Sequence, residues 1–293
     1  DVNEKSKMVA GRALHFVFKV ADRTQTAKFY REILGMKVRI IKLFFYGLDL
    51  DFLRKTPYAN RWSKTMIGYG PEDTHFVVEL TYNYGITNYE QGNDFLGLTV
   101  QSSESLKRAA SNNWPIKENN GQKYLEAPGG YKFYIIDKPQ PVDKDPVVKV
   151  SLASSNLARS ISYWNGLLTL KIFEQTSKSV LLGFSEDQAK LELVEIGEPV
   201  NRAKAYGRIA FSCPFDEQPI IDKKIQDANE TILTPLISLD TPGKATVRVI
   251  ILSDPDGHEI CFVDDESFRQ LSQVDPASDA DLDKYIKADK SRA

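Results

Sequence analysis

Residues that bind metals or form cross-links are scarce in this chain. Its 293 residues include only three histidines, His15, His75 and His258, and two cysteines. Two cysteines cannot build a disulfide framework, and they favour a reducing compartment. We therefore expect an intracellular protein, in the cytoplasm or the mitochondrion, in which any metal centre has few imidazole ligands.

An excess of one charge and long apolar runs are also missing. Lys and Arg number 38 and Asp and Glu number 40, which gives a formal net charge of −2. Nucleic-acid binding depends on a basic surface that neutralises phosphates, so we expect no nucleic-acid partner. The most apolar stretch, Arg39–Leu53, is interrupted by Lys42, Asp49 and Asp51. It falls short of the roughly 18 apolar residues that identify a membrane-spanning helix, so no membrane span is expected.

A strand, a helix and further strands recur along the chain. The segment ALHFVFKVADRTQTAKFYREILGMKV (Ala13–Val38) resembles PVVKVSLASSNLARSISYWNGLLTLKI (Pro146–Ile172), and APGGYKFYII (Ala127–Ile136) resembles DPDGHEICFV (Asp254–Val263). This self-similarity indicates two homologous halves, each of which divides again into two strand–helix–strand units. We predict an α+β fold with domains at 10–138 and 146–264, a proline-rich linker at 137–146 and a helical tail at 265–293.

Alternate residues of a strand point to opposite faces of its sheet. In the first strand His15 and Lys19 lie on one face, and in the strand 76–83 Glu79 and Asn83 share a face. A sheet with helices behind it and these side chains in front forms a concave polar cavity, where a ligand is expected. The opposite, apolar face of the first strand consists of Leu14, Phe16, Phe18 and Val20.

Four segments of the first half resemble the glyoxalase I, or vicinal-oxygen-chelate, superfamily. They are LHFVFKV (Leu14–Val20), FYREILGMKV (Phe29–Val38), IGYGPE (Ile67–Glu72) and ELTYNYG (Glu79–Gly85). The resemblance implies tandem domains built from paired βαβββ modules. It also implies a divalent metal, zinc or nickel, held by His, Glu, His and Glu. In glyoxalase I this centre converts the hemithioacetal of methylglyoxal and glutathione into lactoylglutathione, and a ligand carboxylate moves the proton.

The resemblance assigns the site residue by residue. His15 matches the first metal ligand, and Glu79 matches the second and is the candidate catalytic residue. The third and fourth positions of this cavity hold Arg208 and Cys261. Asn83 matches a glutathione-binding asparagine, and Lys19 replaces a family arginine that contacts the glutathione carboxylate. The corresponding positions of the second cavity hold Lys149, Glu192, Gly97 and Tyr134.

A divalent ion needs neutral or negative ligands, whereas a guanidinium cannot lose its proton. We therefore expect no resident metal, and we predict that Arg208 pairs with Glu79 and Lys149 with Glu192. His15 is interpreted as an inherited, hydrogen-bonded cavity histidine, with a working ligand as the alternative. Cys261 is interpreted as a small buried apolar group, with a reactive thiol as the alternative.

These expectations leave two classes of function open. The first is a glyoxalase-like lyase or isomerase acting on a glutathione-type or small carbonyl ligand, with standard lactoylglutathione formation slow or absent. The second is a metal-free scaffold that binds a small molecule or a protein partner. Two further segments have no assigned role. Thr241–Lys244 is interpreted as a β-turn rather than an anion-binding loop, and Leu43–Leu53 as a buried strand or an interface patch.

Overall fold

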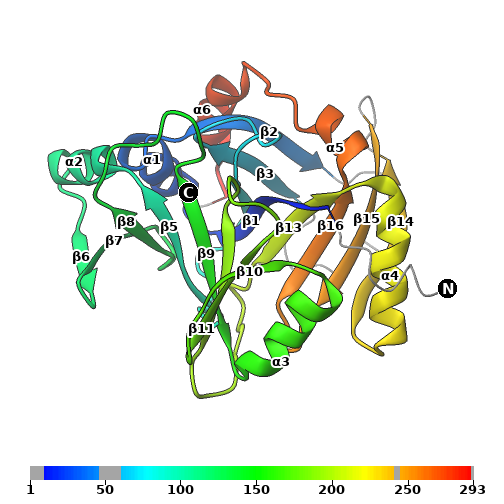
Figure 1. The fold of residues 1–293 in the computed structure, drawn as a ribbon. Coiled ribbons are helices and arrows are strands. Elements are labelled where there is room, and N and C mark those ends of the chain that lie inside the picture. The colour runs from blue at the N-terminus through cyan, green and yellow to red at the C-terminus, as the bar shows by residue number, and fades with distance from the viewer. Residues whose placement is uncertain (1–9, 46–60, 241–244, 292–293) are drawn as a thin grey trace.

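The computed structural model describes residues 10–45, 61–240 and 245–291. The predicted turn at 241–244 and residues 46–53 of the apolar stretch lie outside this part of the chain. The strands form two eight-stranded sheets, as the α+β prediction requires (Figure 1). None of the described helices is long and apolar enough to cross a bilayer.

Sheet 1 combines the first and the last quarter of the chain. Its central pairing is antiparallel, between β1 and β13, with Val17 opposite Arg208. The strands run across the sheet in the order β14 (Ile232–Asp240), β15 (Thr246–Ser253), β16 (Glu259–Asp264), β13 (Arg208–Cys213), β1 (Arg12–Val20), β4 (Val77–Asn83), β3 (Arg61–Gly68) and β2 (Lys37–Phe45).

Sheet 2 combines the two middle quarters, so both sheets are built across the segment 137–146. Its central antiparallel pairing joins β5 to β9. The strands run in the order β10 (Lys171–Gln175), β11 (Ser179–Gly183), β12 (Lys190–Glu195), β9 (Val147–Ser154), β5 (Phe95–Gln101), β8 (Lys132–Ile136), β7 (Gln122–Glu126) and β6 (Ile116–Asn119).

Each quarter carries one helix after its first strand, and polar side chains begin three of these helices. Asp22, Ser102 and Asn156 each accept a hydrogen bond from a backbone N–H three residues on, which satisfies a donor that the helix leaves free. The helical segments are α1 (Arg23–Lys28) with η1 (Phe29–Ile33), α2 (Ser103–Ser111), α3 (Leu157–Ile161) with η3 (Ser162–Leu167), and η4 (Phe215–Glu217) with α4 (Gln218–Asp227).

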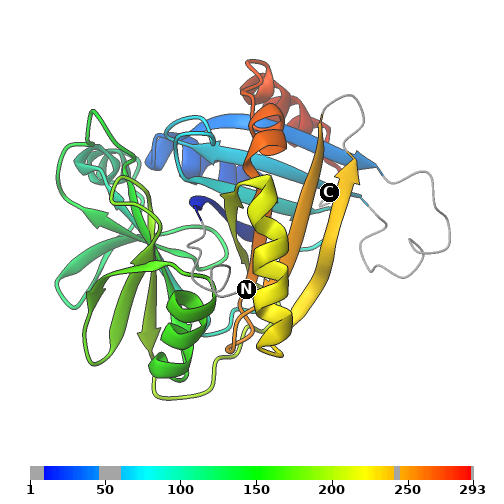
Figure 2. The same cartoon turned by 45° about the vertical axis from the view of Figure 1, so that its right-hand side comes forward.

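One large apolar core joins the two sheets. Phe18 of sheet 1 lies 4.4 Å from Tyr131 and 6.0 Å from Phe133, measured between ring centroids. Trp164 of η3 packs edge-on against Phe211 of sheet 1. Figure 2 shows α3 (green) and α4 (yellow) between the sheets. Because the helix-covered faces pack together in this core, the opposite, concave face of each sheet points away from it.

The predicted apolar face of β1 is wrong at one residue. Phe16, Phe18 and Val20 belong to the main core, but Leu14 lies in a separate cluster with Ala210, Val249 and Phe268. The cause is a β-bulge, since Ala13 pairs with Phe211 and His15 with the next residue of β13, Ala210. The extra residue on β1 turns Leu14 to the concave face.

The chain after β16 forms two helices, α5 (Asp265–Leu271) and α6 (Ser278–Ala288). Phe268 of α5 packs on the concave face of sheet 1 with Leu14 and Val263. Leu282 of α6 is buried in the main core, and Arg31 binds Asp283 at 2.7 Å. The C-terminal segment therefore contacts both faces of sheet 1.

Candidate functional site

Four adjacent strands bring the first predicted set of residues together. His15 on β1, Glu79 on β4, Arg208 on β13 and Cys261 on β16 all lie on the concave face of sheet 1. Val17 lies between Glu79 and Arg208, because it pairs with both of them. Ala210 pairs with both His15 and Cys261, which places those two residues at the same level of the sheet.

His15 lies between two carboxylates. Its Nδ1 is 2.5 Å from Glu72 Oε1, and its Nε2 is 3.4 Å from Glu79 Oε2. A carboxylate only accepts hydrogen bonds, so Nδ1 carries the proton that it donates to Glu72. This bond fixes the orientation of the imidazole and turns Nε2 toward Glu79. The role of Glu72 could not be predicted, because it comes from the loop before β4, where no alternation applies.

Lys64, and not Arg208, pairs with Glu79. Its Nζ lies 2.9 Å from Glu79 Oε2, and Glu79 is 5% exposed. Burial acts to raise the pKa of Glu79, but the positive charges of Lys64, His15 and Arg208 outweigh it and lower that pKa. Glu79 is therefore ionised at neutral pH. The pairing of Lys64 with Glu79 could not be predicted, because it depends on the register of β3, in which Met66 lies opposite Glu79. The strand β3 follows a long connection in which no repeat indicates that register.

The predicted pairing of Arg208 with Glu79 is therefore wrong. Arg208 Nη2 and Nε lie 2.7 and 3.0 Å from Glu259 Oε2. Glu259 is directly opposite Arg208 in the parallel pair of β13 and β16, so it is the nearest carboxylate on the same face. Arg202 Nη1 lies 3.7 Å from the other oxygen of Glu259. This carboxylate thus holds two guanidinium groups at one end of the concave face.

Cys261 borders the apolar part of the concave face. It packs against the cluster of Leu14, Ala210, Val249 and Phe268. Burial raises the pKa of Cys261 to about 11, although Arg208 and Lys64 oppose the change. At neutral pH its sulfur is a thiol and not a thiolate.

Lys19 and Asn83 lie toward the cationic end of the same face. Lys19 Nζ donates a hydrogen bond to the carbonyl of Lys204 at 3.1 Å and lies 3.3 Å from the centroid of the Tyr206 ring. Burial lowers the pKa of Lys19 to about 8, and Glu259 opposes this shift. Arg202 lies over the same ring at 4.7 Å. Asn83 Nδ2 donates to Tyr89 Oη at 2.6 Å, so its amide is already engaged.

The concave face of sheet 2 carries the second predicted set. Lys149 Nζ lies 2.7 Å from Glu192 Oε1, so this predicted ion pair is present, and Ser151 donates to the other oxygen at 2.6 Å. Tyr134 covers Gly97 so closely that a Cβ there would lie 2.6 Å from the ring. Two charged side chains that neutralise each other and an aromatic ring therefore fill the positions of this second site.

Comparison with known proteins assigns the chain. The family model for the C-terminal domain of glyoxalase domain-containing protein 4-like proteins matches residues 156–271, and the N-terminal model of glyoxalase domain-containing protein 4 matches residues 97–137. Glyoxalase domain-containing protein 4 of Rattus norvegicus is 54% identical over 287 residues, which cover 97% of this chain and 95% of that protein. The chain belongs to the glyoxalase domain-containing protein 4 family.

More distant relatives match most of the length of the chain. A protein named glyoxalase 1 from Caenorhabditis elegans is 42% identical over 284 residues, which cover 97% of this chain and 99% of that protein. A lactoylglutathione lyase from Arabidopsis thaliana is 27% identical over 92% of this chain and 96% of its own. The crystal structure of a glyoxalase I mutant from Zea mays superposes with a TM-score of 0.76 at 25% identity, covering 93% of this chain and 98% of that one.

Proposed function

We propose that this chain is a glyoxalase-like protein whose concave face on sheet 1 binds a small carbonyl compound or a glutathione-type adduct without a resident divalent metal. The contact between Lys64 Nζ and Glu79 Oε2, at 2.9 Å, carries the proposal. An ammonium group there neutralises the buried carboxylate that the family resemblance assigns to a metal. Leaving such a carboxylate unpaired in the interior is costly, so one cation or another has to accompany it.

The four inherited positions fit a divalent ion poorly. Arg208 cannot lose its proton, and the thiol of Cys261, with a pKa of about 11, does not supply a thiolate at neutral pH. Of the four positions, only His15 and Glu79 hold side chains that could act as metal ligands, and Glu79 already forms an ion pair with Lys64. Among the residues that the structure describes, no group of three His, Cys, Asp or Glu side chains is arranged to hold a metal. We therefore derive no chemical step through a metal.

The charges on the concave face favour a ligand with an anionic end. Lys19, Arg202 and Arg208 gather around Tyr206 and Glu259, and Asp94 is a second carboxylate near Lys19 and Arg202, so three cations face two carboxylates. A ligand carboxylate, such as those of glutathione, would balance the remaining charge.

In the catalytic form of this proposal, Glu79 is the group that moves a proton. It would take a proton from the hydroxyl-bearing carbon beside the substrate carbonyl and return it to the carbonyl carbon, while the hydroxyl proton passes to the former carbonyl oxygen. Lys64 would donate a hydrogen bond to the oxygen that becomes negative. The lowered pKa of Glu79 makes it a weak base, so we expect slow turnover. The same observation favours the second candidate, a protein that binds this class of ligand without transforming it.

One assay separates these possibilities. The full chain would be treated with a chelator, and lactoylglutathione formation from methylglyoxal and glutathione measured before and after addition of zinc or nickel. We expect no stimulation by either metal and saturable binding of S-methylglutathione that weakens in Lys19→Gln. Stoichiometric zinc or nickel with metal-dependent turnover would overturn the proposal. Loss of metal-independent turnover but not of binding in Glu79→Gln identifies the catalytic form.

We also propose a small molecule, rather than a nucleic acid or a membrane, as the partner of this chain. The two free cysteines, Cys213 and Cys261, are in keeping with the intracellular location expected from the sequence, in the cytoplasm or the mitochondrion.

A further inference from the structure

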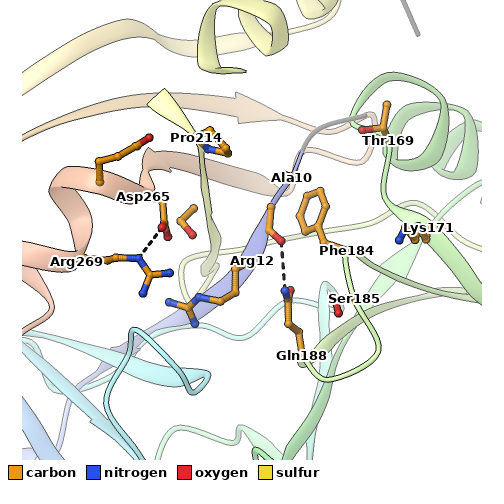
Figure 3. A pocket seen from close by; sticks show the side chains of 13 residues that line it. Ala10, Arg12, Thr169, Lys171, Phe184, Ser185, Gln188, Pro214, Asp265 and Arg269 are labelled. Carbon is orange, nitrogen blue, oxygen red and sulfur yellow. Dashed lines mark hydrogen bonds and ion pairs between the residues drawn. The ribbon is translucent and has the colours of Figure 1, made fainter. Parts of the chain in front are cut away.

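A separate cavity of about 560 Å³ lies where the two sheets meet (Figure 3). None of the residues assigned to the concave face lines it. Arg12 at the start of β1 and Arg269 of α5 contribute from sheet 1 and its tail, and Phe184 and Gln188 contribute from the connection between β11 and β12 of sheet 2. Its volume is in the range of pockets that hold small organic molecules.

Two buried polar atoms of this cavity have no hydrogen-bond partner among the described residues. They are Nε of Arg12, a donor, and Oε1 of Gln188, an acceptor. Each side chain is engaged at another atom, since Arg12 Nη2 donates to the carbonyl of Glu72 and Gln188 Nε2 donates to the carbonyl of Gly11. Buried polar groups are nearly always hydrogen-bonded, so a donor and an acceptor left free beside one cavity indicate a partner that enters it.

The charges of the lining favour an anion as this partner. Arg12 and Arg269 extend into the same part of the cavity (Figure 3), and Lys171 lies at its margin. The two carboxylates of the lining are already engaged. Asp265 binds Arg269 Nε at 2.6 Å, and Glu266 accepts the backbone N–H of Phe215 at 3.0 Å. Burial lowers the pKa of the half-buried Arg12, although the carboxylates of Asp265 and Glu72 oppose the change.

The side of the cavity formed by sheet 2 is less polar. The Phe184 ring is 8% exposed and packs against the backbone of Gly11, where an added Cβ would lie 2.4 Å from the ring. Phe184 therefore forms a fixed apolar wall opposite the two guanidinium groups.

We propose that this cavity is a second ligand site, which binds a small organic anion. The carboxylate or phosphate group of the ligand lies between Arg12 and Arg269, and its uncharged part lies against Phe184 within reach of Gln188. The ligand thus joins the start of β1 and the helix α5 to sheet 2. This site is independent of the function proposed for the concave face.

The test is a calorimetric titration of the full chain with three probes, namely phenyl phosphate, benzoate and inorganic phosphate. We expect saturable binding of phenyl phosphate or benzoate, with the tighter of the two identifying the anionic group, and weaker binding of inorganic phosphate, which lacks the ring. Replacing Arg269 by Gln removes a charge-assisted contact and should weaken binding by about tenfold or more. Among the residues that the structure describes, the Arg269 side chain forms an ion pair only with Asp265, at an exposed position within α5, so this variant should fold normally.

A matched variant separates this site from the concave face. Arg208→Gln removes a guanidinium from that face and should leave the affinity for the probe unchanged. Arg12→Gln should weaken binding as Arg269→Gln does, provided that its melting temperature is retained. The proposal is overturned if none of the probes binds saturably, or if Arg208→Gln abolishes binding while Arg269→Gln does not.

Discussion

The ammonium group of Lys64 lies 2.9 Å from Glu79, a carboxylate that is 5% exposed on the concave face of sheet 1. Its charge, together with those of His15 and Arg208, overcomes the cost of burial and keeps Glu79 ionised. The electrostatics of the whole site depend on this pair.

Replacing Lys64 by Met should destabilise the protein because it leaves Glu79 buried with only the smaller electrostatic contributions of His15 and Arg208. Removing one partner of a buried pair is costly, but Lys64 is itself partly exposed, so we expect a loss of about 2 kcal/mol in the free energy of unfolding. Urea denaturation measures this loss. Lys107→Met, at the fully exposed pair of Lys107 with Glu104, is the matched control and should change little. Adding Glu79→Gln to Lys64→Met should restore much of the stability, and no such recovery would argue against the pairing.

The contribution of Glu79 to the free energy of unfolding should decrease as the solution becomes acidic. The folded-state pKa of Glu79 lies below its ordinary value of 4.5. As the pH falls, Glu79 is therefore protonated in the unfolded chain before it is protonated in the folded protein. The contribution of Glu79 to the free energy of unfolding is complete above the pKa of the unfolded state, and it is lost as the pH falls through the pKa of the folded state. We expect wild type to exceed Glu79→Gln in unfolding free energy by a constant amount near neutral pH, and by less as pH falls below 4.5. A difference that stays constant into strong acid would contradict the lowered pKa.

Gly97 should tolerate no larger side chain while Tyr134 is present. A Cβ at this position would lie 2.6 Å from the Tyr134 ring, so Gly97→Ala should cost about 1–3 kcal/mol, as overpacking does. Thermal denaturation checks this value. Tyr134→Ala in the same chain should relieve part of the loss. Gly166→Ala is the matched control, because its nearest neighbour would be Ser162 Oγ at 3.9 Å, and it should not destabilise the protein.

Both cysteines should be unreactive in the native protein. Burial raises the pKa of Cys261 to about 11 and raises the pKa of Cys213 even further. Since the thiolate is the reactive form, alkylation by iodoacetamide near neutral pH should be slow for both, and fast after denaturation. Mass spectrometry of the alkylated peptides measures this, and rapid native labelling of Cys261 would support the alternative of a reactive thiol.

Strand alternation predicted those parts of the site that depend on neighbouring strands of regular geometry. Lys149 and Glu192 meet as expected because β9 and β12 pair in parallel without a bulge. Arg208 does not reach Glu79 because Glu259 lies directly opposite it on β16. The bulge that turns Leu14 outward leaves no trace in the hydrophobic pattern.

Other contacts could not be predicted because they depend on segments without a period. Glu72 reaches His15 from a loop, and Lys64 is placed by the register of β3. Alternation indicates the face on which each residue lies, and the family resemblance indicates which quarters share a cavity. Neither gives the register of a strand that follows a long connection. The class of fold was therefore predictable, and the partners of individual charges were only partly so.

The union of the first and last quarters in sheet 1 has a consequence for synthesis of the chain. A ribosome releases all strands of sheet 2 before β16 emerges, so that sheet can form while β1–β4 still have an open hydrogen-bonding edge. Pairings so distant in sequence form slowly, and an unpaired edge attracts other chains. A nascent or truncated chain that ends before β13 thus lacks the concave site of sheet 1. It also lacks the strand that covers the open edge of β1 and protects that edge from aggregation.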